Sequence, residues 1–286
     1  MSDEFRVGLV GEGIAESLTP AMHLREAALH GIAYEYHVFD LAPDSREAAD
    51  LGIYLRELRH AGYAAVNVTH PFKQRVIHSL DSLSDAAGTI DAVNLVLLGE
   101  RLTGENTDWS GFEWAIAAGL PGADFGLVAQ IGAGGAGSAT AYALLRHGAA
   151  DVVVFDEEAA RARRVAERYA PLFPGQHIRA EPLGALTRVL AMADGVVHAT
   201  PIGMAKHPGT AFDVARLAPD AWLAEVVYRP IETELVRAAR ARGHRVLDGS
   251  RMAVGQAVDS FRLITGIEPD AERMGAHMLD LIASGN

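Results

Sequence analysis

A run of glycines between an apolar segment and a helix-like segment has the clearest chemistry in this chain. The apolar segment 127–131 predicts a buried strand, and the glycine-rich segment 132–137 follows it directly. Gly132 allows a tight turn, Gly134 lets the backbone approach a pyrophosphate, and Gly137 lets a helix lie close to the strand. The N–H groups that begin this helix can hold phosphate oxygens. The pattern therefore predicts a dinucleotide site.

An acidic residue after the next expected strand strengthens this interpretation. Asp156 ends the apolar run 152–155, about 20 residues beyond the glycines. At that spacing a carboxylate takes the two hydroxyls of a cofactor ribose. The glycines and Asp156 together point to a nicotinamide dinucleotide and hence to hydride transfer.

A lysine and an aspartate could move the proton that hydride transfer leaves behind. Lys73 follows the expected strand 64–68, and desolvation can lower a lysine pKa from about 10.4 towards neutrality, where the group exchanges protons. Asp108 could orient this lysine and accept a hydrogen bond from a substrate hydroxyl. A surface lysine after a turn and a helix N-cap are the open alternatives for these two residues.

Four other polar residues could bind a small polar substrate. Ser17 and Thr19, separated by one residue on an expected loop, could give two hydroxyl donors to one carboxylate. Turn and capping roles explain this pair as well. Asn94 and Gln256 could bind hydroxyls, although their spacing alone gives little support.

The order of the expected elements places these residues on loops of two α/β domains. In the first half we expect strands over 5–10, 34–41 and 64–68, helices over 21–30 (with Thr19 as N-cap) and 48–61, a hairpin over 93–104 and a helix over 109–118. This alternation predicts a mainly parallel sheet with functional loops at the strand carboxyl ends.

The second half continues the alternation. We expect strands over 127–131, 152–155, 195–199, 222–227 and 245–247, and helices over 138–147, 157–169 and 233–242. The helical segment from about 253 to 282 could pack back on the first domain. We therefore expect a substrate-binding and catalytic domain over 1–107, joined by 253–286, and a Rossmann-type NAD-binding domain over 108–252, with the active site in the cleft between them.

Composition excludes several other classes of protein. The chain has 286 residues, of which 49% are hydrophobic and 22% charged, as in globular proteins. Its formal charge of −12 argues against a nucleic-acid partner, and no apolar run approaches the roughly 18 residues of a membrane span. The acidic N-terminus and the absence of cysteine fit a cytoplasmic protein. His23 and His30 lie about two helical turns apart without a ligand pattern, so we expect no metal. A monomer and a homodimer both remain open.

The chain resembles the shikimate/quinate dehydrogenase family along nearly its whole length. The matching segments, in order, are Ser17-Leu-Thr19-Pro-Ala-Met-His23, Asn67-Val-Thr-His-Pro-Phe-Lys73, Asp91-Ala-Val-Asn94, Gly104-Glu-Asn-Thr-Asp108, the glycine segment, Ala199-Thr-Pro-Ile-Gly-Met204, Val227-Tyr228-Arg-Pro230 and Gly255-Gln256-Ala257. Their joint occurrence in this order is highly specific.

This resemblance implies a role for each matched residue. Lys73 and Asp108 would be the catalytic pair, with Lys73 as the acid/base group. The substrate carboxylate would be held by Ser17, Thr19 and Tyr228, and the ring hydroxyls by Thr69, Asn94, Asp108 and Gln256. The cofactor contacts, including those on the nicotinamide side, would be Gly132, Ala133, Gly134, Gly135, Ala136, Gly137, Asp156, Thr200, Gly203, Met204, Val227, Gly249 and Met252.

Two departures from the biosynthetic, NADP-dependent members refine the expectation. Those enzymes usually follow the second strand of the nucleotide domain with an Asn-Arg-Thr-like segment, whereas this chain has Phe155-Asp-Glu-Glu158. Three carboxylates would repel a 2′-phosphate at a cost that can reach several kcal/mol, so NAD is favoured. The open alternative is that Arg161 or Arg163 turns back to meet that phosphate. Thr19 also stands where those enzymes commonly have serine.

Together these departures resemble the NAD-dependent quinate/shikimate dehydrogenases of bacterial quinate catabolism. We expect oxidation of the C3 hydroxyl of quinate to 3-dehydroquinate, and of shikimate to 3-dehydroshikimate. The alternatives are an NADP-dependent biosynthetic shikimate dehydrogenase, an aminoshikimate-type dehydrogenase, and a non-catalytic nucleotide or metabolite sensor on the same fold.

Overall fold

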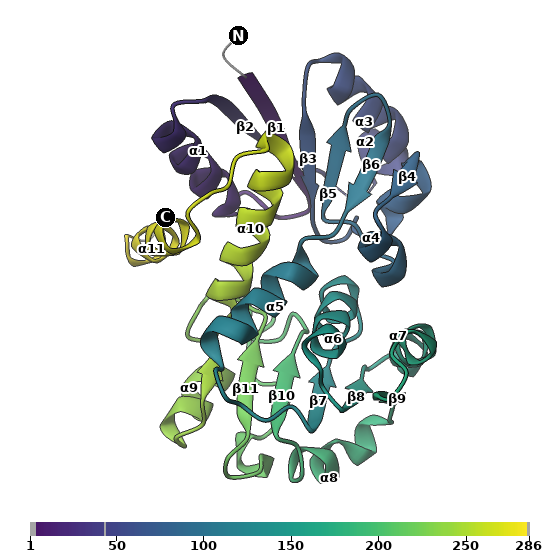
Figure 1. Ribbon diagram of the computed structural model, residues 1–286, viewed down its shortest axis with the longest axis vertical. Helices are drawn as coiled ribbons and strands as arrows, with labels where there is room; N and C mark the ends of the chain where they lie inside the picture. Colours follow the sequence, from purple (N-terminus) through teal and green to yellow (C-terminus); the bar gives the residue numbers. More distant parts are fainter. Residues whose placement is uncertain (1–3, 43, 285–286) are drawn as a thin grey trace. The chain divides into compact units, whose positions relative to one another are not determined.

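The computed structural model describes residues 4–42 and 44–284, which form two compact α/β units (Figure 1). The first unit combines the residues up to Thr107 with those from Val254 onwards, and the second is Asp108–Ala253. Each unit has its own six-stranded sheet. The α/β fold class expected from the sequence is confirmed.

The sheet of the first unit has the strand order β2-β1-β3-β5-β6-β4. Its strands are β1 (Glu4–Gly11), β2 (Ala33–Asp40), β3 (Ala65–Val68), β4 (Ser82–Leu83), β5 (Leu95–Leu98) and β6 (Leu102–Glu105). β1 pairs in parallel with β2 and β3, whereas β5 is antiparallel to both β3 and β6. The expected hairpin is therefore present as β5 and β6. Strand β4 was not expected, because two residues are too few to show an alternating pattern.

The helices of the first unit include α4 (Asp85–Ile90), which was not expected, and differ from the expectation in three further places. They are α1 (Thr19–His30), α2 (Arg46–Ala49), α3 (Leu51–His60), α4, α10 (Gly249–Thr265), in which the division between the units falls, and α11 (Ala271–Ala283). The single helix expected over 48–61 is two helices, because Asp50 leaves helical geometry and caps α3 through the N–H of Ile53. The C-terminal helical segment is broken after α10 at Gly266, whose φ is +72°. Thr19 is the first residue of α1 and not its N-cap, a position that Leu18 occupies.

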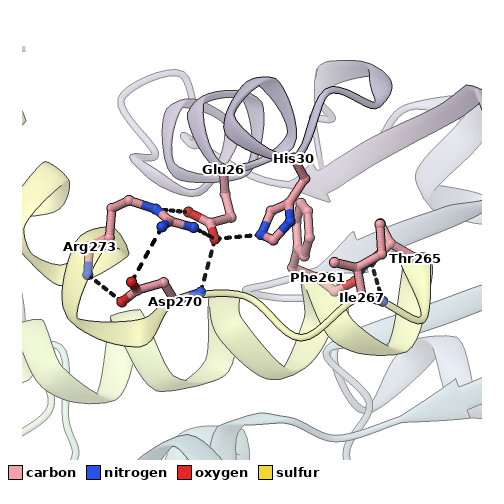
Figure 2. A network of polar contacts seen from close by, with 7 residues as sticks. All are labelled: Glu26, His30, Phe261, Thr265, Ile267, Asp270 and Arg273. Carbon is pink, nitrogen blue, oxygen red and sulfur yellow. Dashed lines mark hydrogen bonds and ion pairs between the residues drawn. The ribbon is translucent and has the colours of Figure 1, made fainter.

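A buried carboxylate joins the C-terminal helices to α1 (Figure 2). Glu26 is 1% exposed and accepts hydrogen bonds from the N–H of Asp270 at 2.9 Å, from Nε of Arg273 at 3.0 Å and from the His30 ring at 3.1 Å. Burial acts to raise the pKa of Glu26, and these hydrogen bonds outweigh it, so that the pKa lies below its usual value. Glu26 thus holds the start of α11 on α1 within the first unit.

The second unit has an entirely parallel sheet with the order β12-β11-β10-β7-β8-β9. Its strands are β7 (Leu127–Ile131), β8 (Asp151–Phe155), β9 (His177–Ala180), β10 (Gly195–His198), β11 (Trp222–Glu225) and β12 (Val246–Leu247), and its helices are α5 (Asp108–Gly119), α6 (Gly135–His147), α7 (Ala159–Tyr169), α8 (Leu186–Leu190) and α9 (Glu234–Ala241). Numbered from β7, this is the 3-2-1-4-5-6 order of a Rossmann fold, with the switch point between β7 and β10. The edge strand β9 was not expected, because Ile178 is its only buried residue.

Neither a membrane-spanning helix nor a metal-binding group of side chains is present in the part of the chain that the structure describes. None of its helices is long and apolar enough to cross a membrane. Across the same residues, no group of three histidine, cysteine, aspartate or glutamate side chains is arranged to hold a metal ion.

Candidate active site

The glycine loop follows β7 in the second unit, and each glycine that the sequence singled out has a distinct geometry. Gly132 has φ +105°, and a Cβ there would lie 2.4 Å from the carbonyl oxygen of Ala199. A Cβ on Gly137 would lie 2.2 Å from the carbonyl oxygen of Gly132, so only glycine fits at either position. At Gly134 a Cβ would meet no atom within 4 Å. The loop is therefore packed closely against other backbone at Gly132 and Gly137, whereas the space beside Gly134 is open.

A buried glutamine that sequence reasoning missed ties the two ends of this loop together. Gln130 is fully buried, and its Nε2 donates to the carbonyls of Gly132 at 3.0 Å and Gly137 at 2.6 Å. Its Oε1 accepts from the hydroxyl of Thr140 at 3.0 Å. In the sequence, the only indication of this role is that Gln130 is a polar residue inside an otherwise apolar strand.

The loop continues into α6, whose N-cap is Gly134 in extended geometry. Gly135, Ala136 and Gly137 form its first turn, where backbone N–H groups lack acceptors within the helix and the helix dipole is positive. Open space beside Gly134 and N–H donors at a helix start suit a pyrophosphate. The residues present therefore fit a dinucleotide.

Asp156 lies directly after β8, where its carboxylate contacts the glycine loop. Its Oδ2 accepts from the N–H of Ala133 at 2.8 Å, and its Oδ1 accepts from the N–H of Glu158 at 2.8 Å. Arg161 lies 3.0 Å from the Glu158 carboxylate and 3.9 Å from that of Asp156. Arg161, one of the two arginines that could turn towards a phosphate, is thus paired with a neighbouring glutamate.

The residues expected on the nicotinamide side lie at the carboxyl ends of β10 and β11 and at the start of α10. Thr200, Gly203 and Met204 follow β10, and Val227 follows β11. A Cβ on Gly249 would lie 2.6 Å from the carbonyl oxygen of Val227, so the start of α10 lies against that backbone. In this group, Met204 is exposed, whereas Met252 is buried in the hydrophobic core of the second unit.

In the first unit, the expected substrate residues Thr69 and Lys73 follow β3. A cis peptide bond joins His70 and Pro71 between them. The backbone carbonyl of Lys73 accepts from the N–H of Val93 at 2.8 Å, which places Lys73 beside the segment that leads into β5. The structure therefore brings Lys73 close along the backbone to Asn94, the next expected substrate residue.

Asn94 and Gln256 are connected by Thr107, for which the sequence predicts no role. The N–H of Thr107 donates to Oδ1 of Asn94 at 2.7 Å, and Nδ2 of Asn94 donates to the Thr107 hydroxyl at 2.9 Å. This hydroxyl in turn donates to the backbone carbonyl of Gln256 at 3.0 Å. Thr107 therefore fixes the amide of Asn94 and attaches it to α10. Its place in the matched segment before Asp108 was the only signal.

The remaining expected substrate residues lie in three places. Ser17 and Thr19 stand at the start of α1, where the N–H of Thr19 points to the Ser17 hydroxyl at 3.4 Å. Asp108 is the first residue of α5 and is 5% exposed, and Tyr228 is half-buried after β11. Asp108 and Tyr228 belong to the second unit, and the other expected substrate residues belong to the first.

A further buried network connects elements of the first unit that carry or precede the expected substrate residues. His23 on α1 contacts the Tyr34 hydroxyl at 2.9 Å and the Ser260 hydroxyl at 3.3 Å, and Nδ2 of Asn67 reaches the same serine at 3.3 Å. Burial lowers the pKa of His23 to about 3, so the ring is neutral. The network joins α1, β3 and α10, the elements next to Thr19, Thr69 and Gln256.

Proteins that are similar to this chain over nearly its whole length are named shikimate or quinate/shikimate dehydrogenases. The family model for the shikimate dehydrogenase substrate binding domain matches residues 9–96. The chain is 48% identical over 284 residues to the shikimate dehydrogenase (NADP(+)) of an Arthrobacter species, covering 99% of this chain and 97% of that protein. It is 45% identical over 281 residues to the quinate/shikimate dehydrogenase (NAD(+)) of Corynebacterium efficiens, covering 98% and 99%.

One solved structure matches nearly the whole chain. The quinate dehydrogenase from Corynebacterium glutamicum in complex with NAD has a TM-score of 0.90 and 44% sequence identity, covering 98% of this chain and 100% of that one. Relatives named for NAD and for NADP share nearly equal identity with this chain. Identity to these named relatives therefore does not distinguish NAD from NADP as the cofactor of this chain.

Proposed function

Because the chain belongs to the shikimate/quinate dehydrogenase family, we propose that it oxidises the C3 hydroxyl of quinate and of shikimate with NAD⁺ as the hydride acceptor. The products are 3-dehydroquinate and 3-dehydroshikimate. The named relatives are oxidoreductases that use a nicotinamide dinucleotide. The preference of this chain for NAD and its activity on both substrates are our proposal.

The observation that carries the choice of NAD is the acidic end of β8. A 2′-phosphate would have to approach the carboxylates of Asp156, Glu157 and Glu158, and like-charge contacts of this kind can cost several kcal/mol. Each oxygen of Asp156 uses one backbone N–H and keeps a second lone pair, with which it can accept from ribose hydroxyls. The nearby Arg161 is paired with Glu158.

The proposed reaction uses residues of this chain for binding and for proton transfer. Ser17, Thr19 and Tyr228 hold the substrate carboxylate, and Thr69, Asn94 and Gln256 hold ring hydroxyls. Lys73 takes the proton of the C3 hydroxyl while Asp108 orients it. NAD⁺ held by the glycine loop and Asp156 would supply the hydride acceptor, so that the C3 alcohol would become a ketone and the hydroxyl proton would be left on Lys73.

Deuterated substrate tests this assignment of the reacting carbon. With quinate that carries deuterium at C3, the protein should produce deuterated NADH, and single-turnover oxidation should slow relative to unlabelled quinate. Unlabelled NADH from that substrate would contradict oxidation at C3. Binding of quinate and NAD⁺ without any turnover would instead identify a non-catalytic sensor.

An NADP-dependent shikimate dehydrogenase is the second candidate. The 48% identity to a relative with that name favours it. It predicts faster turnover with NADP⁺ than with NAD⁺ at equal concentration. An aminoshikimate-type activity is separated from both candidates by rates measured with the aminated substrate.

A further inference from the structure

His198 and Glu225 form a buried polar pair at the carboxyl edge of the sheet in the second unit. Each is the last residue of its strand, β10 and β11, and the two are register partners in this parallel pairing. Their side chains are 1% and 0% exposed, and Nδ1 of the imidazole lies 2.9 and 3.0 Å from the two carboxylate oxygens. The reaction proposed above assigns no role to this pair.

The carboxylate of the pair fixes the chain that follows β11. Oε1 of Glu225 accepts from the N–H of Val227 at 3.0 Å, and Oε2 accepts from the hydroxyl of Thr233 at 3.3 Å. Oγ1 of Thr233 also accepts from the N–H of Val236 and so caps α9. Glu225 therefore sets the backbone at Val227, which is expected to face the nicotinamide.

The imidazole of the pair fixes the loop that follows β10. Its Nε2 lies 2.5 Å from Oγ1 of Thr200, and the same oxygen accepts from the N–H of Ile202 at 3.3 Å. Because a carboxylate only accepts, Nδ1–H of the ring donates to Glu225, and Nε2 forms the second hydrogen bond of the ring with the Thr200 hydroxyl. The hydroxyl of Thr200 is thus directed at His198.

We propose that His198 and Glu225 are positioning residues that hold the two nicotinamide-side segments, the loop 200–204 and the backbone at Val227, in the form that binds NAD⁺. The inference rests on the proposed function. In this arrangement the Thr200 hydroxyl is bonded to His198, so the cofactor contacts the backbone and the methyl group of Thr200. A Rossmann fold binds its ligand at the carboxyl ends of its strands, next to the switch point, here between β7 and β10, so a bond that joins the loops after β10 and β11 acts directly on affinity.

Two ligands separate this role from a general effect on folding. NAD⁺ contains the nicotinamide, whereas ADP-ribose contains only the adenosine, the pyrophosphate and the second ribose. Thr200→Val keeps the side-chain shape and removes the hydroxyl. The expected result is that Kd for NAD⁺ rises about tenfold, the upper range for one neutral hydrogen bond, while Kd for ADP-ribose stays within about twofold. Thr200→Ser should recover most of the affinity for NAD⁺, and Thr187→Val on α8 is the matched control.

A double-variant cycle then tests the connection to His198. In His198→Gln the side chain can still donate to Glu225 but offers no ring nitrogen to Thr200, so adding Thr200→Val should change Kd for NAD⁺ little further. Unfolding by heat checks that each variant is folded; if His198→Gln does not fold, the Thr200 series alone decides.

Unchanged NAD⁺ binding in Thr200→Val, equal losses for NAD⁺ and ADP-ribose, or additive effects in the double variant would overturn the positioning role. Failure of the unaltered protein to bind NAD⁺ at all would overturn the proposed function itself, which is a different result.

Discussion

The carboxylate of Asp156 accepts a hydrogen bond from the backbone N–H of Ala133, 2.8 Å away, so the acid at the end of β8 supports the glycine loop after β7. One residue therefore links the two parts of the sequence that pointed to a dinucleotide. It also gives Asp156 two roles: it shapes the loop and, under our proposal, accepts from the ribose.

Replacing this carboxylate should weaken the preference for NAD. We expect Asp156→Asn to lower kcat/KM for NAD⁺ by about 10- to 100-fold, since hydrogen bonds to a charged group are lost, and to raise the NADP⁺/NAD⁺ ratio of kcat/KM. Glu157→Gln removes one charge from an exposed neighbour and serves as the control. Equal effects of both changes would show that charge alone matters and that the acceptor role of Asp156 is wrong.

Releasing Arg161 should also shift the selectivity towards NADP⁺, through a gain with NADP⁺ rather than a loss with NAD⁺. Glu158 holds Arg161 at 3.0 Å, and Glu158→Gln removes that charge. We expect kcat/KM for NADP⁺ to rise about tenfold while the value for NAD⁺ changes little, because a freed arginine can pair with the 2′-phosphate. Glu167→Gln, an exposed change on the same helix, is the comparison. No gain with NADP⁺ would show that this ion pair does not restrain Arg161.

Loss of the proposed acid/base group should affect chemistry and leave cofactor binding intact. We expect Lys73→Ala to reduce kcat by roughly 10²- to 10⁴-fold, the usual contribution of a positioned proton acceptor, with Kd for NAD⁺ unchanged. Lys206→Ala removes the only other lysine of the chain, on an exposed loop, and should retain activity. Near-normal turnover by a folded Lys73→Ala variant would exclude the assigned role.

Thr107 should act on substrate affinity through Asn94. Thr107→Val removes the hydroxyl that accepts from Asn94 and donates to the Gln256 carbonyl. We expect KM for quinate and shikimate to rise about 5- to 10-fold, as one or two hydrogen bonds are lost, with Kd for NAD⁺ unchanged. Thr103→Val, which removes a hydroxyl bonded to Ser82, is the control. If both variants have the same KM, Thr107 does not position Asn94.

Glu26 should make the stability of the first unit depend on pH. Its pKa is lower in the folded chain than in the unfolded chain, so its contribution is complete above the unfolded value of about 4.3 and is lost as the pH falls through the folded value. We expect Glu26→Gln to reduce the free energy of unfolding by about 2 kcal/mol at neutral pH and to flatten its decline in acid. Denaturant unfolding of this variant and of the exposed control Glu272→Gln, at several pH values, measures both. If the free energy of unfolding changes with pH by the same amount in Glu26→Gln and in the unaltered protein, Glu26 is not the source of this pH dependence.

The sequence predicted those parts of the fold that depend on local pattern. Glycines at 132 and 137 are required by a turn and a close approach, and both requirements are visible from residue spacing. The break at Asp50 and the short strand β4 were not predictable, because a capping geometry and a two-residue pairing leave no periodic signal.

The buried polar partners were also missed, and for a related reason. Thr107, His198 and Glu225 act through partners that are distant in sequence, and Gln130 ties together a nearby loop whose closed geometry leaves no pattern in the sequence, so only the folded chain shows what each one holds. The residues expected to contact ligands could be named from their segments, whereas the residues that orient them could not.

The most direct test of the central claim is the initial rate with each pairing of quinate or shikimate with NAD⁺ or NADP⁺. We predict turnover of both substrates and a higher kcat/KM with NAD⁺ than with NADP⁺ for each. A higher kcat/KM with NADP⁺ would contradict the role given to the acidic end of β8 and would identify an NADP-dependent enzyme instead.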